Sequence, residues 1–360
     1  MLRITVVQNQ ISHKLIFLIF YFPKGGFILS KNTKRAILVY FALLISVLIW
    51  NVNYNTFGNT FLPSFFLSLA TFLIIFTPFE IYFTFRDFWY ERWIPVSDND
   101  LQISKIKIKV EKGKRNNREI QALLIGLTNN KESQELNSVI LIAHGFSDTK
   151  ESLQNFYLPF VRLGYLIFIY DARGTGDSKN VGKRGDFLSR INDFKVIVNW
   201  IKNDPRLKEK RIFSVGFSIG ALTILCGGFS DERLEKIIAI SAISNYRKNL
   251  PRYNLIALLS YLIKGVKLLP TKSVNEKISP LLLFKKVKNE SSDELWQKLS
   301  KRVLLVHSKN DRIIKLINFI ENRNALELPP ENQLILRKGG HNLKKNELIL
   351  LGASLKFLII

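Results

Sequence analysis

Gly216-Phe217-Ser218-Ile219-Gly220 is the most informative stretch of this 360-residue sequence. It follows an apolar run at 212–215 that is typical of a buried strand, and it precedes a helix-compatible run at 221–225. A strand, a sharp turn and a helix with serine at the apex is the setting in which G-x-S-x-G presents a reactive hydroxyl. Gly216 and Gly220 allow the tight turn. An ordinary turn rich in glycine and serine could have the same sequence, so the choice between the two depends on the rest of the chain.

The sequence beyond about residue 95 alternates strands with helices. The segment 105–110 alternates lysine with apolar residues, and 120–127 reads as its antiparallel partner. A helix is expected over 186–202. Continuous apolar runs, which are typical of strands buried on both faces, follow at 139–143, 165–170, 212–215, 237–243, 303–306 and 334–336. This order predicts a mostly parallel, doubly wound sheet.

The first 94 residues have a different character. Two uncharged apolar stretches, about 36–54 and 61–79, are close to the ~17–25 residues that cross a bilayer. Buried soluble helices would look similar, but the short uncharged link between them favours a transmembrane hairpin. The apolar segment at 15–22 is too short to span a bilayer, and we expect it to lie at the membrane interface or to dip into the membrane. The predicted domains are therefore a membrane anchor over 1–94 and an α/β domain over 95–360.

The orientation of the hairpin follows from its basic residues. Lys24, Lys31, Lys34 and Arg35 precede the first stretch, Arg86 and Arg92 follow the second, and the link has none. The positive-inside rule then places both ends of the hairpin, and everything after residue 95, in the cytoplasm.

Composition narrows the classes of function. The net charge is +24, and it is scattered in short clusters without a zinc-finger or aromatic-basic pattern. A basic surface beside an anionic membrane explains it better than nucleic-acid binding, which is not expected. The single cysteine, Cys226, excludes an intramolecular disulfide and a cysteine metal cluster.

A serine needs a base and an orienting group before it is a good nucleophile. Of the four histidines, His341 follows the last strand in a glycine-rich loop, and Asp311 closes the loop after the strand at 303–306. The order Ser218, Asp311, His341 is that of the hydrolases with an α/β sheet. All three loops would emerge at the carboxyl edge of that sheet.

The tetrahedral intermediate needs backbone donors as well. We expect the N–H groups of Ile219, after the nucleophile, and of Phe146, in the loop after the strand at 139–143. His144 and Gly145, which precede Phe146, have a supporting role only.

These motifs resemble those of α/β-hydrolase-fold serine hydrolases over residues 95–360, and the membrane-anchored subset is similar to the Bem46-like and ABHD-type hydrolases. The resemblance rests on the Ser218 stretch, Asp311, His341, His144-Gly145-Phe146 and the run Asp171-Ala172-Arg173-Gly174-Thr175-Gly176-Asp177-Ser178. It implies that Asp171 and Arg173 hold the loop beneath the site. Ser308 stands where these proteins often have glycine before the acid.

The long interval 244–301 is expected to contain a cap or lid, because one crossover needs fewer residues. Its apolar part at 255–269 is flanked by basic residues and suits a lid, a membrane-contacting surface or a plain packing helix.

The sequence thus predicts a membrane-anchored serine hydrolase that cleaves carboxylic esters or thioesters, with a lipid or other acyl substrate, membrane lipids as neighbours, and no metal or cofactor. A serine peptidase or amidase on the same fold stays open, as does a catalytically silent membrane scaffold. An oligopeptidase with a propeller is not expected, because too few residues precede the catalytic domain.

Overall fold

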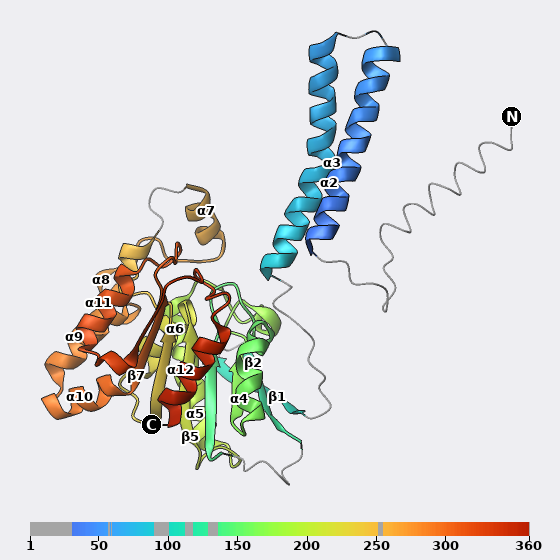
Figure 1. The fold of residues 1–360 in the computed structure, drawn as a ribbon. Coiled ribbons are helices and arrows are strands. Elements are labelled where there is room, and N and C mark those ends of the chain that lie inside the picture. The colour runs from blue at the N-terminus through green and yellow to red at the C-terminus, as the bar shows by residue number, and fades with distance from the viewer. Residues whose placement is uncertain are drawn as a thin grey trace. The chain divides into compact units, whose positions relative to one another are not determined.

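The computed structural model describes residues 31–56, 58, 60–89, 101–111, 118–128, 136–250 and 255–359. The chain divides into two compact units, Met1–Glu91 and Arg92–Ile360. The first contains a helical hairpin and the second an α/β sheet domain (Figure 1). The segment at 15–22 and the flanking Lys24 and Arg92 lie outside the described residues.

The hairpin consists of α2 (Lys31–Asn51), a short π-helical turn (Val52–Thr56) and α3 (Phe61–Trp89). The stretches Ala36–Thr56 and Phe61–Ile81 are long and apolar enough to cross a membrane, by length and composition alone, and only 11% of each is buried inside the structure.

Small residues line the contact between the two helices. Ala42 and Ser46 on α2, and Ser64 and Ser68 on α3, are buried, each pair spaced by four residues. The Ser68 hydroxyl donates to the Ser46 carbonyl at 2.8 Å. This close seam of small residues is the kind that packs helices in lipid.

An eight-stranded sheet forms the second unit, in the order β1-β2-β4-β3-β5-β6-β7-β8. The strands are β1 (Leu101–Glu111), β2 (Arg118–Leu127), β3 (Ser138–Ala143), β4 (Leu166–Tyr170), β5 (Arg211–Phe217), β6 (Leu234–Ile240), β7 (Val303–Ser308) and β8 (Gln333–Leu336). Pairing of β2 with β1 and with β4 is antiparallel, and all other pairs are parallel. The predicted fold class, an α/β-hydrolase sheet, is confirmed.

Helices cover both faces of this sheet (Figure 1). One face packs on α4 (Gln154–Arg162) and α12 (Glu347–Ile359) through a core that includes Phe160 and Phe357. The other packs on α5 (Phe187–Asn203), α6 (Ile219–Gly228), α9 (Pro280–Glu290), α10 (Asp293–Lys301) and α11 (Ile317–Leu326). Strands β3 and β7 are buried along their whole length because both faces are covered.

The interval 244–301 has two parts. In α9 and α10, Phe284 and Trp296 pack against Phe229 of the main core, with ring centroids 4.8 and 5.8 Å apart. These helices therefore serve as the crossover between β6 and β7. The earlier part contains α7 (Leu255–Ile263) and α8 (Lys272–Lys277), and its Tyr246 and Val266 join a separate apolar cluster with Ile219.

Helix α6 is fixed at its carboxyl end by one side chain. All ten of its residues are buried. The Arg302 guanidinium donates to the carbonyls of Gly228 and Phe229 and, at 3.0 and 2.7 Å, to those of Asp231 and Leu234. A cation on the last carbonyls stabilises this end of the helix dipole.

Candidate active site

Ser218 lies at the turn between β5 and α6. Its backbone has φ 55° and ψ −112°, a region that non-glycine residues rarely adopt. The Ser218 N–H donates to the carbonyl of Ile240 at 2.8 Å, so the turn is tied to the neighbouring strand β6. Strained backbone of this kind persists only where the surroundings hold it.

Close packing explains the two glycines of the motif. A Cβ on Gly216 would lie 2.6 Å from the Gly220 carbonyl group, and a Cβ on Gly220 would lie 2.0 Å from the carbonyl oxygen of Ala143. Strand β3 and helix α6 thus approach too closely for any side chain at these positions. The turn that exposes Ser218 depends on both glycines.

Ser218, Asp311 and His341 meet, although three separate loops carry them. His341 Nε2 lies 2.9 Å from Ser218 Oγ, and His341 Nδ1 lies 2.8 Å from Asp311 Oδ2. With the proton on Nδ1 donated to the carboxylate, Nε2 is free to accept the serine proton. Nucleophile, base and orienting acid therefore form one continuous chain of hydrogen bonds.

The Asp311 carboxylate is buried and accepts three hydrogen bonds, one of them from His341. Its Oδ1 accepts the N–H groups of Ile313 and Ile314 at 2.8 and 2.9 Å. Burial alone would raise the pKa of Asp311, but the hydrogen bond from His341 and the two backbone donors outweigh it, and the pKa is lowered. The group stays charged and can support a positive His341.

The loop that carries His341 is held by Asn310. The Asn310 Oδ1 accepts the Gly340 N–H at 2.8 Å and the Ser308 hydroxyl at 2.7 Å. Serine at 308 is therefore accommodated, because its hydroxyl joins this contact. No motif in the sequence marks Asn310 for this role.

The two expected oxyanion donors come from adjoining segments. A Cβ on Gly145 would lie 3.5 Å from the Phe217 carbonyl oxygen, so the loop with Phe146 lies against the Ser218 turn. Within the described part of the chain, neither the Phe146 N–H nor the Ile219 N–H donates a hydrogen bond. Ile219 opens α6, where N–H groups have no intrahelical acceptor.

His144 fastens the start of this loop. Its Nε2 accepts the Ala172 N–H at 2.9 Å, and its Nδ1 lies 2.7 Å from the Gly145 carbonyl, to which it donates. Burial, and then the charge of Arg190, lower the pKa of His144 to about 3. The ring is therefore neutral at ordinary pH, which suits a fixed structural contact.

Lys150 holds the other end of this loop, and no motif in the sequence marks it for this role. Its ammonium contacts Asp171 and Asp177 at 2.6 Å each and Glu151 at 2.8 Å. The backbone N–H of Lys150 also donates to Asp171, at 2.7 Å. The three carboxylates lie close enough together for a metal ion. Because the Lys150 ammonium contacts all of them, it already supplies the cation there.

The second supporting residue, Arg173, forms a bidentate pair with Asp193. Its Nε and Nη2 donate to the two carboxylate oxygens at 2.7 Å each. Both side chains are buried, so the pair fixes the loop after β4 to α5. Both residues that the resemblance placed beneath the site, Asp171 and Arg173, thus bind that loop to other elements.

Another histidine, His307, approaches the triad without joining it. Its Nε2 lies 2.9 Å from the Ile314 carbonyl and 3.9 Å from Asp311 Oδ2. Burial lowers the pKa of His307. A neutral ring that donates to Ile314 braces the turn whose N–H groups hold Asp311.

Apolar side chains surround the site on the side of α7, which belongs to the earlier part of the interval 244–301. The Phe146 ring lies 5.8 Å from Phe187 and 6.0 Å from Tyr261, and the Lys264 ammonium lies 5.6 Å from the same ring. Ile219 belongs to the same apolar cluster. From the sequence, Lys264 was identified only as one of the basic residues beside the apolar stretch at 255–269, and Tyr261 was not identified individually.

Comparison with known proteins agrees with this geometry. The family described as serine aminopeptidase, S33, matches residues 134–296, which include Ser218 but neither Asp311 nor His341. No curated protein matches the sequence. The family match and the three-residue arrangement together indicate a serine hydrolase of α/β fold.

Solved structures of both peptidases and esterases share the fold. A Mycobacterium tuberculosis puromycin-hydrolyzing peptidase is 16% identical, with TM-score 0.53 over 73% of this chain and 39% of its own. Porphyromonas gingivalis dipeptidyl peptidase 4 is 15% identical, with TM-score 0.51 over 72% and 36%. The Pyrococcus furiosus esterase PF2001 is 18% identical, with TM-score 0.50 over 74% and 94%. The chain spans well under half the length of the two peptidases.

Proposed function

We propose that this chain is a membrane-anchored serine hydrolase that cleaves carboxylic ester or thioester bonds with an apolar acyl group. The observation that carries the proposal is the position of His341, within hydrogen-bond distance of both Ser218 and Asp311. A positioned base of this kind turns a weak hydroxyl nucleophile into a reactive one.

In the proposed acylation, Ser218 Oγ attacks the carbonyl carbon while its proton passes to His341 Nε2. The carbonyl oxygen becomes an oxyanion, which the N–H groups of Phe146 and Ile219 stabilise. Collapse of this intermediate breaks the bond to the leaving group, which takes the proton from His341. Asp311 remains charged throughout and stabilises the imidazolium.

In the proposed deacylation, a water molecule takes the place of the leaving group. His341 removes its proton, the hydroxyl attacks the acyl carbon, and the same two N–H groups hold the second oxyanion. Ser218 then recovers its proton as the acid departs. The chain's own residues supply every group in this cycle.

The preference for an apolar acyl group is inferred from the side chains around the site. Phe146 and Ile219 supply the proposed backbone donors, and both side chains join the apolar cluster that includes Ile243, Tyr246 and Ile314. An acyl chain beside the reacting carbonyl would meet this cluster, and its burial there is favourable.

The anchoring part of the proposal rests on the two apolar helices. Their outward surfaces are apolar, and Lys31, Lys34 and Arg35 stand at the start of α2. We propose that α2 and α3 cross the membrane as a hairpin with the catalytic domain in the cytoplasm.

A serine peptidase or amidase is the second candidate, and the match to the serine aminopeptidase family favours it. The same triad attacks amides, so the chemistry alone does not separate the two. A p-nitrophenyl ester and the matching p-nitroanilide, with one acyl group, separate them directly.

The test is labelling of the purified full-length protein by a fluorophosphonate ester. We expect labelling in the unmodified protein and none in Ser218→Ala. Ser214→Ala is the matched control, since this serine is buried in the same strand and its hydroxyl has no partner within the described residues. A folded, unlabelled parent protein would contradict the hydrolase and favour a catalytically silent scaffold.

A further inference from the structure

Helix α7 has two faces with different surroundings. Leu259, Leu262 and Ile263 are 60, 54 and 75% exposed. Residues at i, i+3 and i+4 lie on one side of a helix, so the three form a single apolar stripe. Tyr261 lies on the opposite side, where its ring contacts Phe146. One face of α7 therefore meets the active-site loop, and the other is apolar and uncovered.

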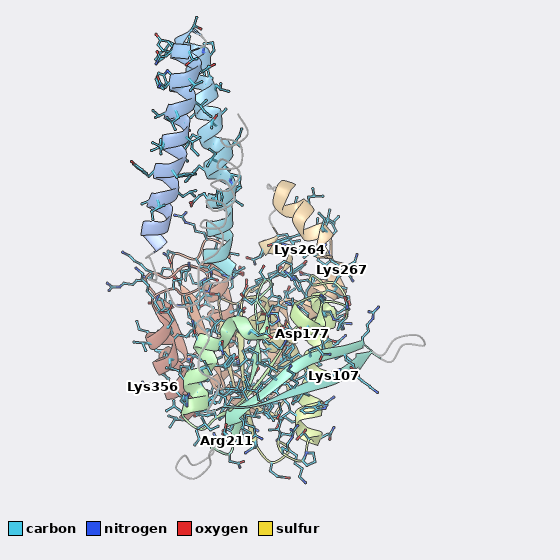
Figure 2. All side chains as sticks on the ribbon, turned by 90° about the vertical axis from the view of Figure 1, so that its right-hand side faces the viewer. Lys107, Asp177, Arg211, Lys264, Lys267 and Lys356 are labelled. Atoms are coloured by element: carbon cyan, nitrogen blue, oxygen red, sulfur yellow. The ribbon has the colours of Figure 1, made fainter. Side chains whose placement is uncertain are left out.

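The segment after α7 extends this surface. Leu269 is 91% exposed. Lys264 and Lys267 lie beside it, and Figure 2 shows both at the base of α7. The helix stands out from the body of the α/β unit (Figure 1). Apolar side chains with lysines at their edge are the pattern of a helix that lies in a membrane interface.

Charge selects the partner. A second protein would have to match the apolar stripe with a shaped surface, whereas a bilayer takes any apolar stripe of this size. Basic residues beside the stripe are attracted to an anionic lipid surface. The chain as a whole carries a net charge of +24, which adds to this attraction.

We propose that the exposed stripe of α7, with Leu269 and Lys267, docks onto an anionic lipid bilayer as a second membrane contact. The docked helix bears on the active site because its other face touches Phe146. Through this contact, membrane docking positions the loop with the proposed oxyanion donor. The docking stands by itself, and only its effect on turnover rests on the proposed function.

Lys264 connects the end of α7 to the active-site side. Its carbonyl accepts the Gly185 N–H at 2.8 Å, and its ammonium lies over the Phe146 ring. The end of α7 is thereby fixed to the loop before α5. A displacement of α7 by lipid would act on Phe146, since both the Lys264 ammonium and the Tyr261 ring contact its ring.

Depth of immersion is the decisive measurement, because α2 and α3 could hold the full-length protein in vesicles whether or not α7 docks. The single cysteine, Cys226, is buried, so a Cys226→Ala background allows one new labelling site. An NBD fluorophore is attached at Leu262→Cys. The matched control is Glu209→Cys, an exposed position just before β5 at the amino edge of the sheet.

In vesicles containing phosphatidylglycerol, doxyl groups on the lipid chains should quench the probe at 262 and leave the probe at 209 unquenched. Lys267→Glu should reduce the quenching at 262, and zwitterionic vesicles should show less of it than anionic ones. Equal quenching at 262 and 209 would overturn the proposal. So would quenching or a blue shift at 262 that appears only in nanodiscs holding two copies, which would assign the surface to a second copy.

Turnover gives the second readout. The double variant Leu262→Asp/Ile263→Asp should hydrolyse an ester dispersed in anionic vesicles at least about tenfold more slowly, since two apolar side chains no longer enter the interface. Its hydrolysis of a short soluble ester should equal that of the parent, which also shows that it is folded. Equal loss on both esters would contradict the proposed coupling. A parent inactive on both would instead refute the proposed function, and the quenching result would stand.

Discussion

The buried contact of Lys150 with Asp171 invites a direct test, Lys150→Met. Methionine keeps most of the length of the side chain and removes the charge. Both partners are almost fully buried, with 3 and 0% of their side-chain surfaces exposed, and their charged atoms are 2.6 Å apart. The variant therefore leaves the Asp171 carboxylate inside the protein without its cation.

The size of the effect follows from what Asp171 keeps. Breaking a buried ion pair by removing one partner costs about 3–5 kcal/mol. Asp171 retains two backbone donors, the N–H groups of residue 150 and of Asp177, at 2.7 and 2.8 Å. We therefore expect the lower end, a loss of about 3 kcal/mol in the free energy of unfolding.

Activity should fall too, because Lys150 ends the loop that carries Phe146. Losing one oxyanion donor outright costs about 10²–10³ in kcat, and a displaced donor should cost less, about 10–10². Two assays in the same detergent test this. One is urea unfolding, monitored by tryptophan fluorescence, and the other is ester hydrolysis.

Lys298→Met is the control, since Lys298 pairs with Glu232 at 3.5 Å with both side chains exposed. Such a surface pair is worth less than about 1 kcal/mol. The double variant Lys150→Met/Asp171→Asn should regain part of the loss, because no buried charge is left unpaired. If Lys150→Met costs no more than Lys298→Met, burial does not determine the stability that the Lys150 pair contributes.

Three further predictions follow from the same contacts. Asp311→Asn should lower kcat by about 10⁴ with an unchanged unfolding midpoint, because His341 would no longer be held in the correct orientation. A loss of less than tenfold would count against the triad. Gly220→Ala should prevent folding or cost several kcal/mol, whereas Gly352→Ala, with no atom within 4 Å of its added Cβ, should stabilise α12 by about 0.5–1 kcal/mol; equal melting temperatures would contradict this. Because the pKa of His144 is lowered from 6.5 to about 3, the unfolded chain binds a proton there that the folded chain does not, so stability should fall as pH drops from 6.5 towards 3. His144→Gln should flatten that part of the urea-midpoint curve, and an unchanged slope would be inconsistent with a buried neutral ring.

The central sheet could be predicted from the sequence because its strands are buried on both faces and read as unbroken apolar runs. One boundary was wrong for a physical reason. The run at 237–243 predicts a strand to Ile243, but β6 ends at Ile240, since Ser241 has φ 52° and turns the chain. Serine seldom adopts that conformation, so no sequence signal marks it.

The site was predictable to the extent that its chemistry restricts the residue types. Ser218, Asp311 and His341 each follow a strand in the expected order, and the structure brings them within hydrogen-bond distance. Lys150 was not predictable, because a lysine in a polar loop looks like any exposed lysine. Only the fold brings it to the carboxylates of Asp171 and Asp177. The division of 244–301 into crossover helices and a cap escaped the sequence for the same reason.

The burial of α6 decides which side of the active site can adapt. The helix is enclosed along its whole length, held at one end by Arg302 and joined at the other to the Ser218 turn, which is tied to β6. This side of the active site is therefore rigid. We expect the position of α6 to stay the same when acyl groups of different sizes are attached to Ser218. Any room must come from Phe146 and the α7 side. Substrate range should thus evolve through the cap, while the reaction chemistry stays fixed.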